Sequence, residues 1–428
     1  MSLAGAIALF VFVAAEPTSS DIPAHLTFED AVRIARDRSP DLAIADADVV
    51  ASRAQLQATG AIPNPAVSFT AGWSSQCAYP GCNVPAYSAA LGDQGAVALL
   101  VTGQRGLAVD AAALGVRSAE TSRLDVRRNL EFEVKRQFVA TSVAWRSVGY
   151  GEREAVRARE AVELARRRFA AGQIPAGDLS RLEMLHLQIE QAVDRARLNH
   201  EQARILLAQL LGLTDGAQTF TVVTGPTKSA DPPPRLAVTT LPELLALAWE
   251  RRPDLAAAQA QVEQARARAE LARRRVIPQF QLQAQYAQQG APGGWFTPPT
   301  AGFGISVPLP VLYQQQGEIG AADAAVTAAE GNVAKVRARV VAEVATAFAT
   351  FQATQRTARR AEVQLLALSR DVRDTVGAAY ERGTASLLDY LDTQRSRIAN
   401  EIEYLTILQA FWTSVFEVER AVGLSFVP

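Results

Sequence analysis

The chain has 428 residues, and 43 lysine and arginine residues balance 44 aspartate and glutamate residues. Because a balanced chain has no extended positive field, the charge argues against a role in binding nucleic acid. About half of the residues are apolar (49%), yet no apolar run reaches the roughly 20 residues that a transmembrane helix needs.

An apolar stretch opens the chain, LAGAIALFVFVAA from Leu3 to Ala15. It is too short to span a bilayer as a helix, and small residues precede the Glu16-Pro17 that follows it, as at the cleavage site of a secretory signal. The sequence therefore predicts a signal peptide over residues 1–15, although no lysine or arginine precedes the apolar run. The alternative is an apolar N-terminal tip with no targeting role.

The next feature is a loop with the only two cysteines, Cys77 and Cys82, in CAYPGC. The Pro-Gly pair between them is typical of a turn, so the two thiols can close a small ring. In an exported protein we expect a disulfide. The alternative is two free thiols; a metal site is not expected, because no histidine is near.

Several sequence stretches occur twice in the same order. RSPDLAIADADV from Arg38 is echoed by RRPDLAAAQAQV from Arg251, and LLGL from Leu210 by AVGL from Ala421. AIPNPAVSFTAGW is echoed by VIPQFQLQAQYAQ, and FAAGQIPAGDLSRLE by YERGTASLLDYLDTQ. We predict an internal duplication. The predicted divisions are a first repeat over 16–224, a proline-rich linker over 225–239 that is not helical, and a second repeat over 240–428.

Each repeat is expected to be mainly helical. It begins with a helix that ends at Ile-Pro, and it continues after two strands with a very long helix, a turn and a return helix. At about 1.5 Å per residue the long helices extend about 90–100 Å, and their charges on several faces suit a helical bundle or coiled-coil wall. The predicted helices are 26–60, 107–169 and 179–211 in the first repeat, and 241–276, 317–382 and 387–422 in the second.

Four short stretches have the period of a β-strand, and QFQLQAQYAQQ from Gln279 shows it most clearly, with glutamines on one face and apolar residues on the other. Strands are predicted near 66–73, 96–102, 279–288 and 302–309. Each has the length of a tilted transmembrane strand. The predicted lipid-facing residues are Val67, Phe69, Trp73, Phe280, Leu282, Tyr286, Phe303, Ile305 and Val307. Trp73, Trp295 and Phe296 are expected at a membrane–water boundary.

Four strands cannot close a barrel, and open strand edges are not tolerated in lipid. A membrane location therefore requires several chains that each contribute strands. The alternatives are a soluble β-sandwich, whose strands also alternate, and an aggregation-prone glutamine-rich strand.

Two motifs give the chain a family resemblance over about residues 26–425. YERGTASLLDYLDTQRS from Tyr380 and LTFEDAVRIARDRSPDL from Leu26 resemble the TolC-type outer-membrane efflux family. The resemblance implies a homotrimer with a twelve-stranded barrel in the outer membrane of a Gram-negative bacterium, continued by a periplasmic helical tunnel. It also implies two protein partners, a periplasmic adaptor and an inner-membrane pump of the RND type.

Two further stretches, LLVTGQRGLAVDAA from Leu99 and ISVPLPVLYQQQGEIGAADA from Ile305, resemble the CzcC-like heavy-metal branch of that family. The expected function is therefore a passive conduit in the efflux of heavy-metal cations. Multidrug efflux and type I secretion remain alternatives, and a soluble periplasmic coiled-coil scaffold or adaptor is the alternative of another class. No enzyme is expected: His25, His186 and His200 have no spacing typical of a zinc motif or a catalytic triad, and no cofactor or metal site is predicted.

Asp389 and Asp392 are the predicted gate, because residues three apart share one helix face. The implied threefold symmetry would gather their copies into carboxylate rings, which favour cations. The alternative is two solvated acids near a helix N-terminus. The first repeat offers Asp178, with Arg181 in place of a second acid. By resemblance, Tyr380 helps to hold the closed state.

The two turns between long and return helices, 170–178 and 381–389, are predicted tips on which the adaptor docks. The alternative is turns that simply need glycine. In the second turn Ala385 stands where some family members have an arginine, so their closed-state contacts do not transfer. The predicted docking residues are Gly172, Gln173, Gly177, Gly383, Thr384, Ala385 and Ser386.

Overall fold

In the computed structural model of the chain, the residues described are 23–74, 84–213, 220–223, 229–291, 295–382 and 384–427. The predicted signal peptide, the Cys77–Cys82 disulfide and the docking residue Gly383 lie outside them. The chain is mainly helical with a small sheet part, as predicted. It divides into two compact units, which share the residues of three long helices.

The hairpin unit consists of Met1–Ser39, Leu130–Pro233 and Thr350–Glu417, and the sheet unit consists of Pro40–Asn129, Pro234–Ala349 and Val418–Pro428. The helices are α1 (Phe28–Arg38), α2 (Pro40–Gly60), α3 (Ala96–Val101), α4 (Gln104–Ala170), α5 (Ala176–Leu210), α6 (Pro234–Val238), α7 (Leu241–Arg251), α8 (Pro253–Arg274), α9 (Gln316–Arg360), α10 (Leu366–Glu381) and α11 (Leu387–Val422). The strands are β1 (His25–Leu26), β2 (Ala66–Ser74), β3 (Val84–Gly92), β4 (Thr221–Val222), β5 (Gln281–Gln289) and β6 (Thr300–Ser306).

The opening helix of each repeat is broken into two, which corrects the single helices predicted over 26–60 and 241–276. The breaks fall at Ser39-Pro40 and at Arg252-Pro253, where the residue before proline has extended backbone. Proline disfavours helical backbone in the residue before it, but it suits the first position of the next helix. The linker over 225–239 was predicted to contain no helix. This is also wrong, because Pro234 begins the short helix α6.

A glycine at the end of each return helix packs on the break in the opening helix. Gly212 follows α5 with φ +72°, and Gly423 follows α11 with φ +81°. A Cβ added to Gly212 would lie 2.5 Å from the carbonyl oxygen of Arg38, and one added to Gly423 would lie 3.1 Å from that of Arg251. Both places therefore require glycine, for backbone conformation and for space. These are the echoed LLGL and AVGL stretches, meeting the echoed RSPDL and RRPDL stretches.

The long helices differ between the repeats. In the first repeat α4 is one helix of 67 residues. In the second, the five residues Ala361–Leu365 form a π-helical turn, η3, between α9 and α10. Single π-turns in long helices are rare and often occur at functional sites. The return helix α5 forms a hairpin with α4, and the return helix α11 forms a hairpin with α9 and α10.

An aromatic core joins the first and last helices of the hairpin unit. The Phe28 ring of α1 lies 5.5 Å from the ring of Phe138 on α4 and 5.5 Å from the ring of Phe416 on α11. The ammonium group of the buried Lys135 lies over the Phe28 and Phe416 rings, at 5.8 and 5.5 Å. This cation–π contact offsets part of the cost of burying the charge.

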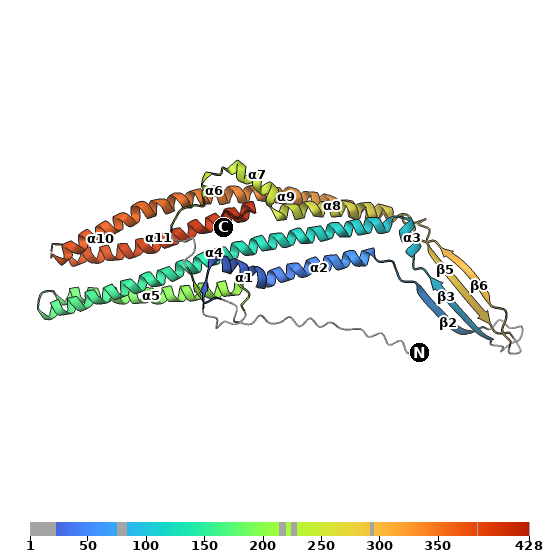
Figure 1. The fold of residues 1–428 in the computed structure, drawn as a ribbon, viewed down its shortest axis with the longest axis horizontal. Helices are drawn as coiled ribbons and strands as arrows, with labels where there is room; N and C mark the ends of the chain where they lie inside the picture. The colour runs from blue at the N-terminus through green and yellow to red at the C-terminus, as the bar shows by residue number, and fades with distance from the viewer. Residues whose placement is uncertain are drawn as a thin grey trace. The chain divides into compact units, whose positions relative to one another are not determined.

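The sheet unit contains one four-stranded antiparallel sheet in the order β2-β3-β5-β6 (Figure 1). The second strand of the first hairpin is Val84–Gly92, and residues 96–101 form the helix α3, so the strand predicted near 96–102 is wrong. The run AVALLV lacks a period of two, and β3 escaped prediction because its alternation uses small side chains. In the hairpin unit, β1 and β4 form a short parallel pair.

Candidate functional site: a two-faced sheet and two hairpin tips

Strand register places the apolar side chains of all four strands on one face of the sheet. Paired residues in antiparallel strands point to the same side, so each row of pairs belongs to one face. One such row is Phe69, Ala89, Tyr286 and Ala301. The apolar members of this face are Val67, Phe69, Ala71, Trp73, Pro85, Tyr87, Ala89, Leu91, Leu282, Ala284, Tyr286, Ala301, Phe303 and Ile305, and its one polar member is Gln288, which pairs with Tyr87.

The opposite face is polar or small except at Val84, which pairs with Ser74 at the loop end. Its other residues are Ala66, Ser68, Thr70, Gly72, Ser74, Ala86, Ser88, Ala90, Gly92, Gln281, Gln283, Gln285, Ala287, Gln289, Thr300, Gly302, Gly304 and Ser306. A Cβ added to Gly304 would lie 3.0 Å from the amide nitrogen of Gln283, and one added to Gly302 would lie 3.3 Å from that of Gln285. Glycine thus leaves room for the glutamine side chains of β5 to lie across β6.

The register gathers the predicted lipid-facing residues of three strands on the apolar face. Phe280 and Val307 lie just beyond the ends of β5 and β6, in phase with the apolar positions. Tyr87, Ala89 and Leu91 of β3 belong to the same face but were missed, because β3 was not predicted. In the single chain Phe303 is 93% exposed, and Phe69 and Trp73 are also exposed. A contiguous apolar surface of this kind marks a contact with lipid or protein.

Aromatic residues gather at the loop end of the sheet. Trp73 is paired with Pro85 near the end of β2, and Phe296 forms a bridge with Gly290 beyond the end of β5. The Tyr87 and Phe296 rings lie 6.0 Å apart, and Trp295 is 79% exposed. Amphipathic rings at one level favour a boundary between apolar and aqueous surroundings.

The first hairpin tip joins α4 to α5. Gly172 has φ +70°, and the amide of Gln173 donates to the carbonyl of Arg168 at 2.8 Å. This is a helix end that glycine favours. Asp178 lies in the first turn of α5 and forms an ion pair of 3.4 Å with Arg181. The acid of the first repeat is therefore paired with the residue that replaces its second acid.

The second tip joins α10 to α11, and its first acid caps a helix. The Ser386 hydroxyl and backbone amide donate to the Asp389 carboxylate at 2.7 and 3.3 Å, and the Asp389 amide donates to the Ser386 hydroxyl at 3.1 Å. This reciprocal arrangement is a capping box. Asp389 and Asp392 are both exposed, whereas Leu387 and Leu391 beside them are buried. The two acids thus share an exposed face, and Asp389 has a structural role as well.

The two hairpins pack on one another near their tips. Leu387 and Leu391 of α11 belong to one apolar cluster with Val162 of α4 and Leu185 of α5. Tyr380 packs against this cluster, and its ring stacks on that of Tyr390 at 4.7 Å. The stacking therefore helps to position Tyr380, the residue to which the resemblance assigns a part in holding the closed state.

A buried ion pair lies further along the same two hairpins. The Glu154 carboxylate of α4 pairs with the Arg397 guanidinium of α11, and their side chains are only 4% and 9% exposed. Arg157 also pairs with Glu154, at 2.7 Å. Any shift of one hairpin along the other would leave a buried charge without its partner, which destabilises a protein strongly. The pair therefore favours one register of α4 against α11.

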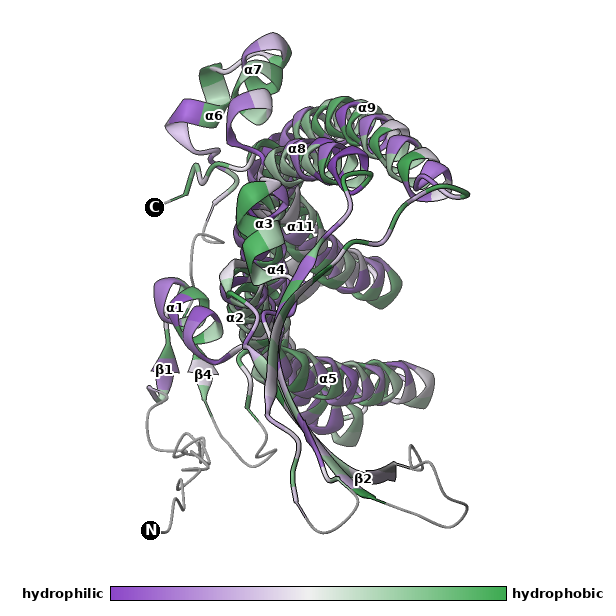
Figure 2. Ribbon diagram, turned by 90° about the vertical axis from the view of Figure 1, so that its right-hand side faces the viewer, coloured by the Kyte–Doolittle hydropathy of each residue, from purple (hydrophilic) through white to green (hydrophobic). Residues whose placement is uncertain are grey.

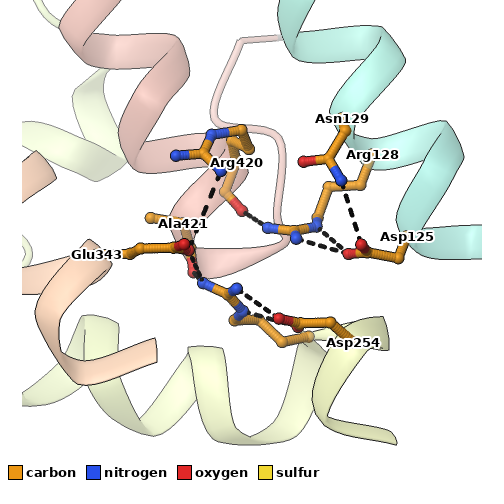
Figure 3. A network of polar contacts seen from close by, with 8 residues as sticks. Asp125, Arg128, Asn129, Asp254, Glu343, Arg420 and Ala421 are labelled. Carbon is orange, nitrogen blue, oxygen red and sulfur yellow. Dashed lines mark hydrogen bonds and ion pairs between the residues drawn. The ribbon is translucent and has the colours of Figure 1, made fainter. Parts of the chain in front are cut away.

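The sheet unit contains a second polar network, at the break between α7 and α8 (Figure 3). Arg252, whose side chain is 1% exposed, donates to both Asp254 oxygens at 2.6 and 2.9 Å and to Glu343 of α9 at 2.6 Å. It also donates to the Ala421 carbonyl of α11 at 3.1 Å. Burial raises the pKa of Asp254, but hydrogen bonding and the charge of Arg252 outweigh it and hold the pKa below its ordinary value of 3.8.

A neighbouring arginine extends the network to α4. Arg128 pairs with Asp125 at 2.6 Å and donates to the Arg420 carbonyl of α11 (Figure 3). The network therefore ties three helices to the start of α8. This network was not predicted from the sequence. The one local indication of it is Arg252, because the matching position in the first repeat is Ser39.

Among the described residues no cluster of His, Cys, Asp and Glu is arranged to hold a metal ion. None of the described helices has a segment both long and apolar enough to cross a bilayer.

Two segments, residues 31–213 and 244–424, each match the family model described as outer membrane efflux protein. Together they include most of the chain.

The chain belongs to the outer membrane efflux protein family.

The predicted resemblance is thereby confirmed, and individual members of the family are similar over most of their length. The efflux-family chain is 24% identical over 323 residues to the cobalt-zinc-cadmium resistance protein CzcC of Cupriavidus metallidurans, covering 75% of this chain and 74% of CzcC. It is 27% identical over 330 residues to the outer membrane protein OprJ of Pseudomonas aeruginosa, covering 73% of this chain and 65% of OprJ. The structure of CusC has the same fold, with a TM-score of 0.78, 18% identity, and 93% and 92% of the two chains covered.

Proposed function

We propose that this efflux-family chain is the outer-membrane channel of a tripartite efflux system, a passive conduit from periplasm to exterior. The sorting of the sheet into an apolar face and a glutamine-rich face carries the proposal. A strand in a membrane barrel needs one face for acyl chains and one for water. A soluble sandwich would cover the apolar face with a second sheet, and the sheet unit has a single four-stranded one among its described residues.

The open edges of the sheet support assembly from several chains. In the single chain β2 and β6 each have one neighbour, and an unpaired strand edge is not tolerated in hydrocarbon. Three chains with four strands each would close a twelve-stranded barrel, and each edge would pair with the edge of the next chain. The hairpins of the three chains would then form the wall of the periplasmic tunnel.

The hairpin tips fit contacts with protein partners. Gly172 and Gln173 at the first tip, and Thr384 and Ala385 at the second, are small or polar residues in short turns. An adaptor with helical hairpins would dock there and connect the channel to an inner-membrane RND-type pump. Asp389 and Asp392 would line the narrow end as rings of carboxylates that favour cations.

Heavy-metal cations are the proposed cargo. The support is the similarity to CzcC, a cobalt-zinc-cadmium resistance protein, together with the acidic face of the second tip. The test is a gene deletion in the native bacterium. We expect lower tolerance of Co²⁺, Zn²⁺ and Cd²⁺, restored by the wild-type gene, and unchanged tolerance of a panel of organic toxic compounds. Loss of tolerance of the organic compounds alone would assign the channel to multidrug efflux.

Membrane fractionation and conductance test the channel itself. The protein is expected to sediment with the outer membrane in an extract made without detergent, and the purified protein to give ion conductance in planar bilayers. A monomer that stays in solution without detergent would instead support the soluble scaffold or adaptor.

A further inference from the structure

Two apolar segments lie beyond the strands, at the end of the sheet opposite the hairpin loops. One is the helix α3, which follows β3, and the other is Val307–Tyr313, which follows β6. Both leave the sheet at the same end, because Gly92 near the end of β3 and Ser306 at the end of β6 pair with neighbouring residues of β5, Gln283 and Gln281. We call these two segments the ledge. Figure 1 shows α3 at this end of the sheet, and Figure 2 shows that it is hydrophobic.

The ledge exposes large apolar side chains in an ordered arrangement. The exposed members are Val97, Leu100, Val101, Val307, Leu309, Val311, Leu312 and Tyr313, among which Leu312 is 98% and Val101 is 72% exposed. On α3 the residues 97, 100 and 101 share one helix face, and Ala98 on another face is fully buried. After β6, the alternation of Phe303 and Ile305 continues through Val307 to Leu309.

Hydrogen bonds fix both parts of the ledge. The Asp93 carboxylate accepts from the amides of Gly95 and Val97 at 3.1 and 3.2 Å, and from the amide of Leu282 on β5 at 2.8 Å. It thereby holds the start of α3 to the sheet. The Tyr313 hydroxyl donates to Glu318 at 2.6 Å and accepts from the Gly317 amide at 2.9 Å, while about half of the tyrosine side chain remains exposed (52%).

The strands stand at or below the height of the apolar band of an outer-membrane barrel, and β6 is the shortest of them. β2 has 9 residues and β6 has 7, which at about 3.3 Å per residue are about 30 and 23 Å long. Tilted by about 40°, they stand only about 23 and 18 Å high, against an apolar band of about 25 Å. Apolar side chains beyond the strand ends would therefore extend the band, most clearly after β6.

Basic residues accompany the ledge. Arg274 and Arg275 are exposed at the end of α8, a few residues before β5, whereas the neighbouring Arg273 pairs with Asp323 of α9 at 2.6 Å. A Cβ added to Gly103, just after α3, would lie 3.9 Å from the guanidinium of Arg274. Apolar side chains with guanidinium groups beside them match the boundary between acyl chains and lipid phosphates.

We propose that the ledge inserts into the outer membrane at its periplasmic boundary, with the apolar residues among acyl chains and the arginines at the phosphates. This inference rests on the proposed function. It adds that the membrane contact of each chain extends beyond its strands to a short helix and a loop, which fix the depth of the channel in the bilayer.

Spin labels on the assembled protein in phospholipid nanodiscs test the proposal. In a chain whose two cysteines are replaced by serine, single cysteines are introduced as Val101→Cys and Leu312→Cys. Val238→Cys on α6, where Val238 is 80% exposed, is the matched aqueous control, and Phe303→Cys on the apolar strand face is the lipid control. Collision of each label with oxygen and with a water-soluble nickel complex is measured.

We expect the ratio of oxygen to nickel collisions at positions 101 and 312 to be several-fold higher than at 238. If the ratio at positions 101 and 312 equals that at 238 while the ratio at 303 is high, the ledge does not enter lipid, and the proposed function is unaffected. Low collision rates with both reagents at 101 and 312 would refute it as well, because a neighbouring subunit would then cover the ledge. A ratio at position 303 as low as that at 238 would instead contradict the proposed membrane barrel.

Discussion

Single side chains in this protein have roles that depend on their partners more than on their type. Asp389 and Asp178 are both acids in the first turn of a return helix, but Asp389 completes a capping box with Ser386, while Asp178 is paired with Arg181. Arg251 and Arg252 are neighbours, yet the first is exposed and the second is buried among carboxylates. Their substitutions are expected to have different effects.

Neutralising the proposed gate should change ion selectivity. Asp392→Asn removes an exposed carboxylate and leaves the capping box intact, so the channel is expected to gain anion conductance and lose part of its block by multivalent cations. Adding Asp389→Asn should strengthen both effects. Current–voltage curves in asymmetric salt measure the change. Asp374→Asn, at an exposed acid of α10, is the control, and identical selectivity in all variants would remove the two acids from the gate.

Loss of Arg252 should destabilise the protein. Arg252→Met leaves Asp254 and Glu343 without their shared cation, and removal of one partner of a buried pair costs about 3–5 kcal/mol. Arg251→Met is the matched control, because the exposed Arg251 is expected to contribute less than about 0.5 kcal/mol. Thermal unfolding in detergent measures the difference. Equal unfolding temperatures for the two variants would mean that the network adds no stability.

The Asp254 carboxylate should make stability dependent on pH. Its pKa is lower in the folded than in the unfolded protein, so its contribution is complete above the unfolded value of about 3.9 and is lost as pH falls through the folded value. Wild type should therefore exceed Asp254→Asn by about 1.5–3 kcal/mol near neutral pH, and the gap should narrow below about pH 4. Unfolding midpoints measured from pH 3 to 7 test this; a gap independent of pH would contradict it.

The ends of helices and strands in this protein are determined by local residues such as proline and glycine and by contacts with residues distant in the chain. Pro40 and Pro253 break the opening helices, and Gly212 and Gly423 end the return helices against those breaks. Their proline and glycine signals are visible in the sequence. The start of α3 is different, because it depends on Asp93 and on the amide of Leu282, far away in the chain.

Removing the Asp93 carboxylate should loosen α3. Asp93→Ala leaves three backbone amides without their acceptor, and charge-assisted bonds of this kind are worth about 1.5–3 kcal/mol. Hydrogen exchange of the amides of Gly95 and Val97 should therefore become about ten- to a hundredfold faster. Asp48→Ala, at an exposed position of α2, should leave those rates unchanged. Unaltered exchange in Asp93→Ala would show that α3 is held by packing alone.

A single chain leaves both edges of its four-stranded sheet without a neighbouring strand, and the proposed channel would pair them between chains. The four strands are ordered β2-β3-β5-β6, so within one chain the two edges are separated by three strand spacings, about 14 Å. Pairing between chains is the way to satisfy both edges in lipid.

Disulfides between the two edges should therefore form only between chains. In the cysteine-free background, Thr70→Cys on β2 is combined with Gly302→Cys or Gly304→Cys on β6. A disulfide needs Cα atoms within about 7 Å, which one chain cannot provide across its own sheet. Oxidation should give linked dimers and trimers on denaturing gels, whereas each single variant should give monomers. Monomers from both double variants would contradict edge-to-edge assembly.

Hydrophobic periodicity and the proline and glycine residues that end helices are local properties. The sequence alone was therefore enough to predict the long helices, three of the four strands and the two faces of β5. Glutamines alternating with Phe280, Leu282 and Tyr286 need no partner to be recognised. The placement of β3, the burial of Arg252 and the capping role of Asp389 could not be obtained in this way. Arg252 and Glu343 are 91 positions apart in the chain and meet only in the folded protein. Strand β3 is defined by its pairing with β2 and β5 rather than by its own weak alternation. Long-range pairing decides such features, because the energy of a buried charge or a strand edge depends on the groups that folding brings beside it.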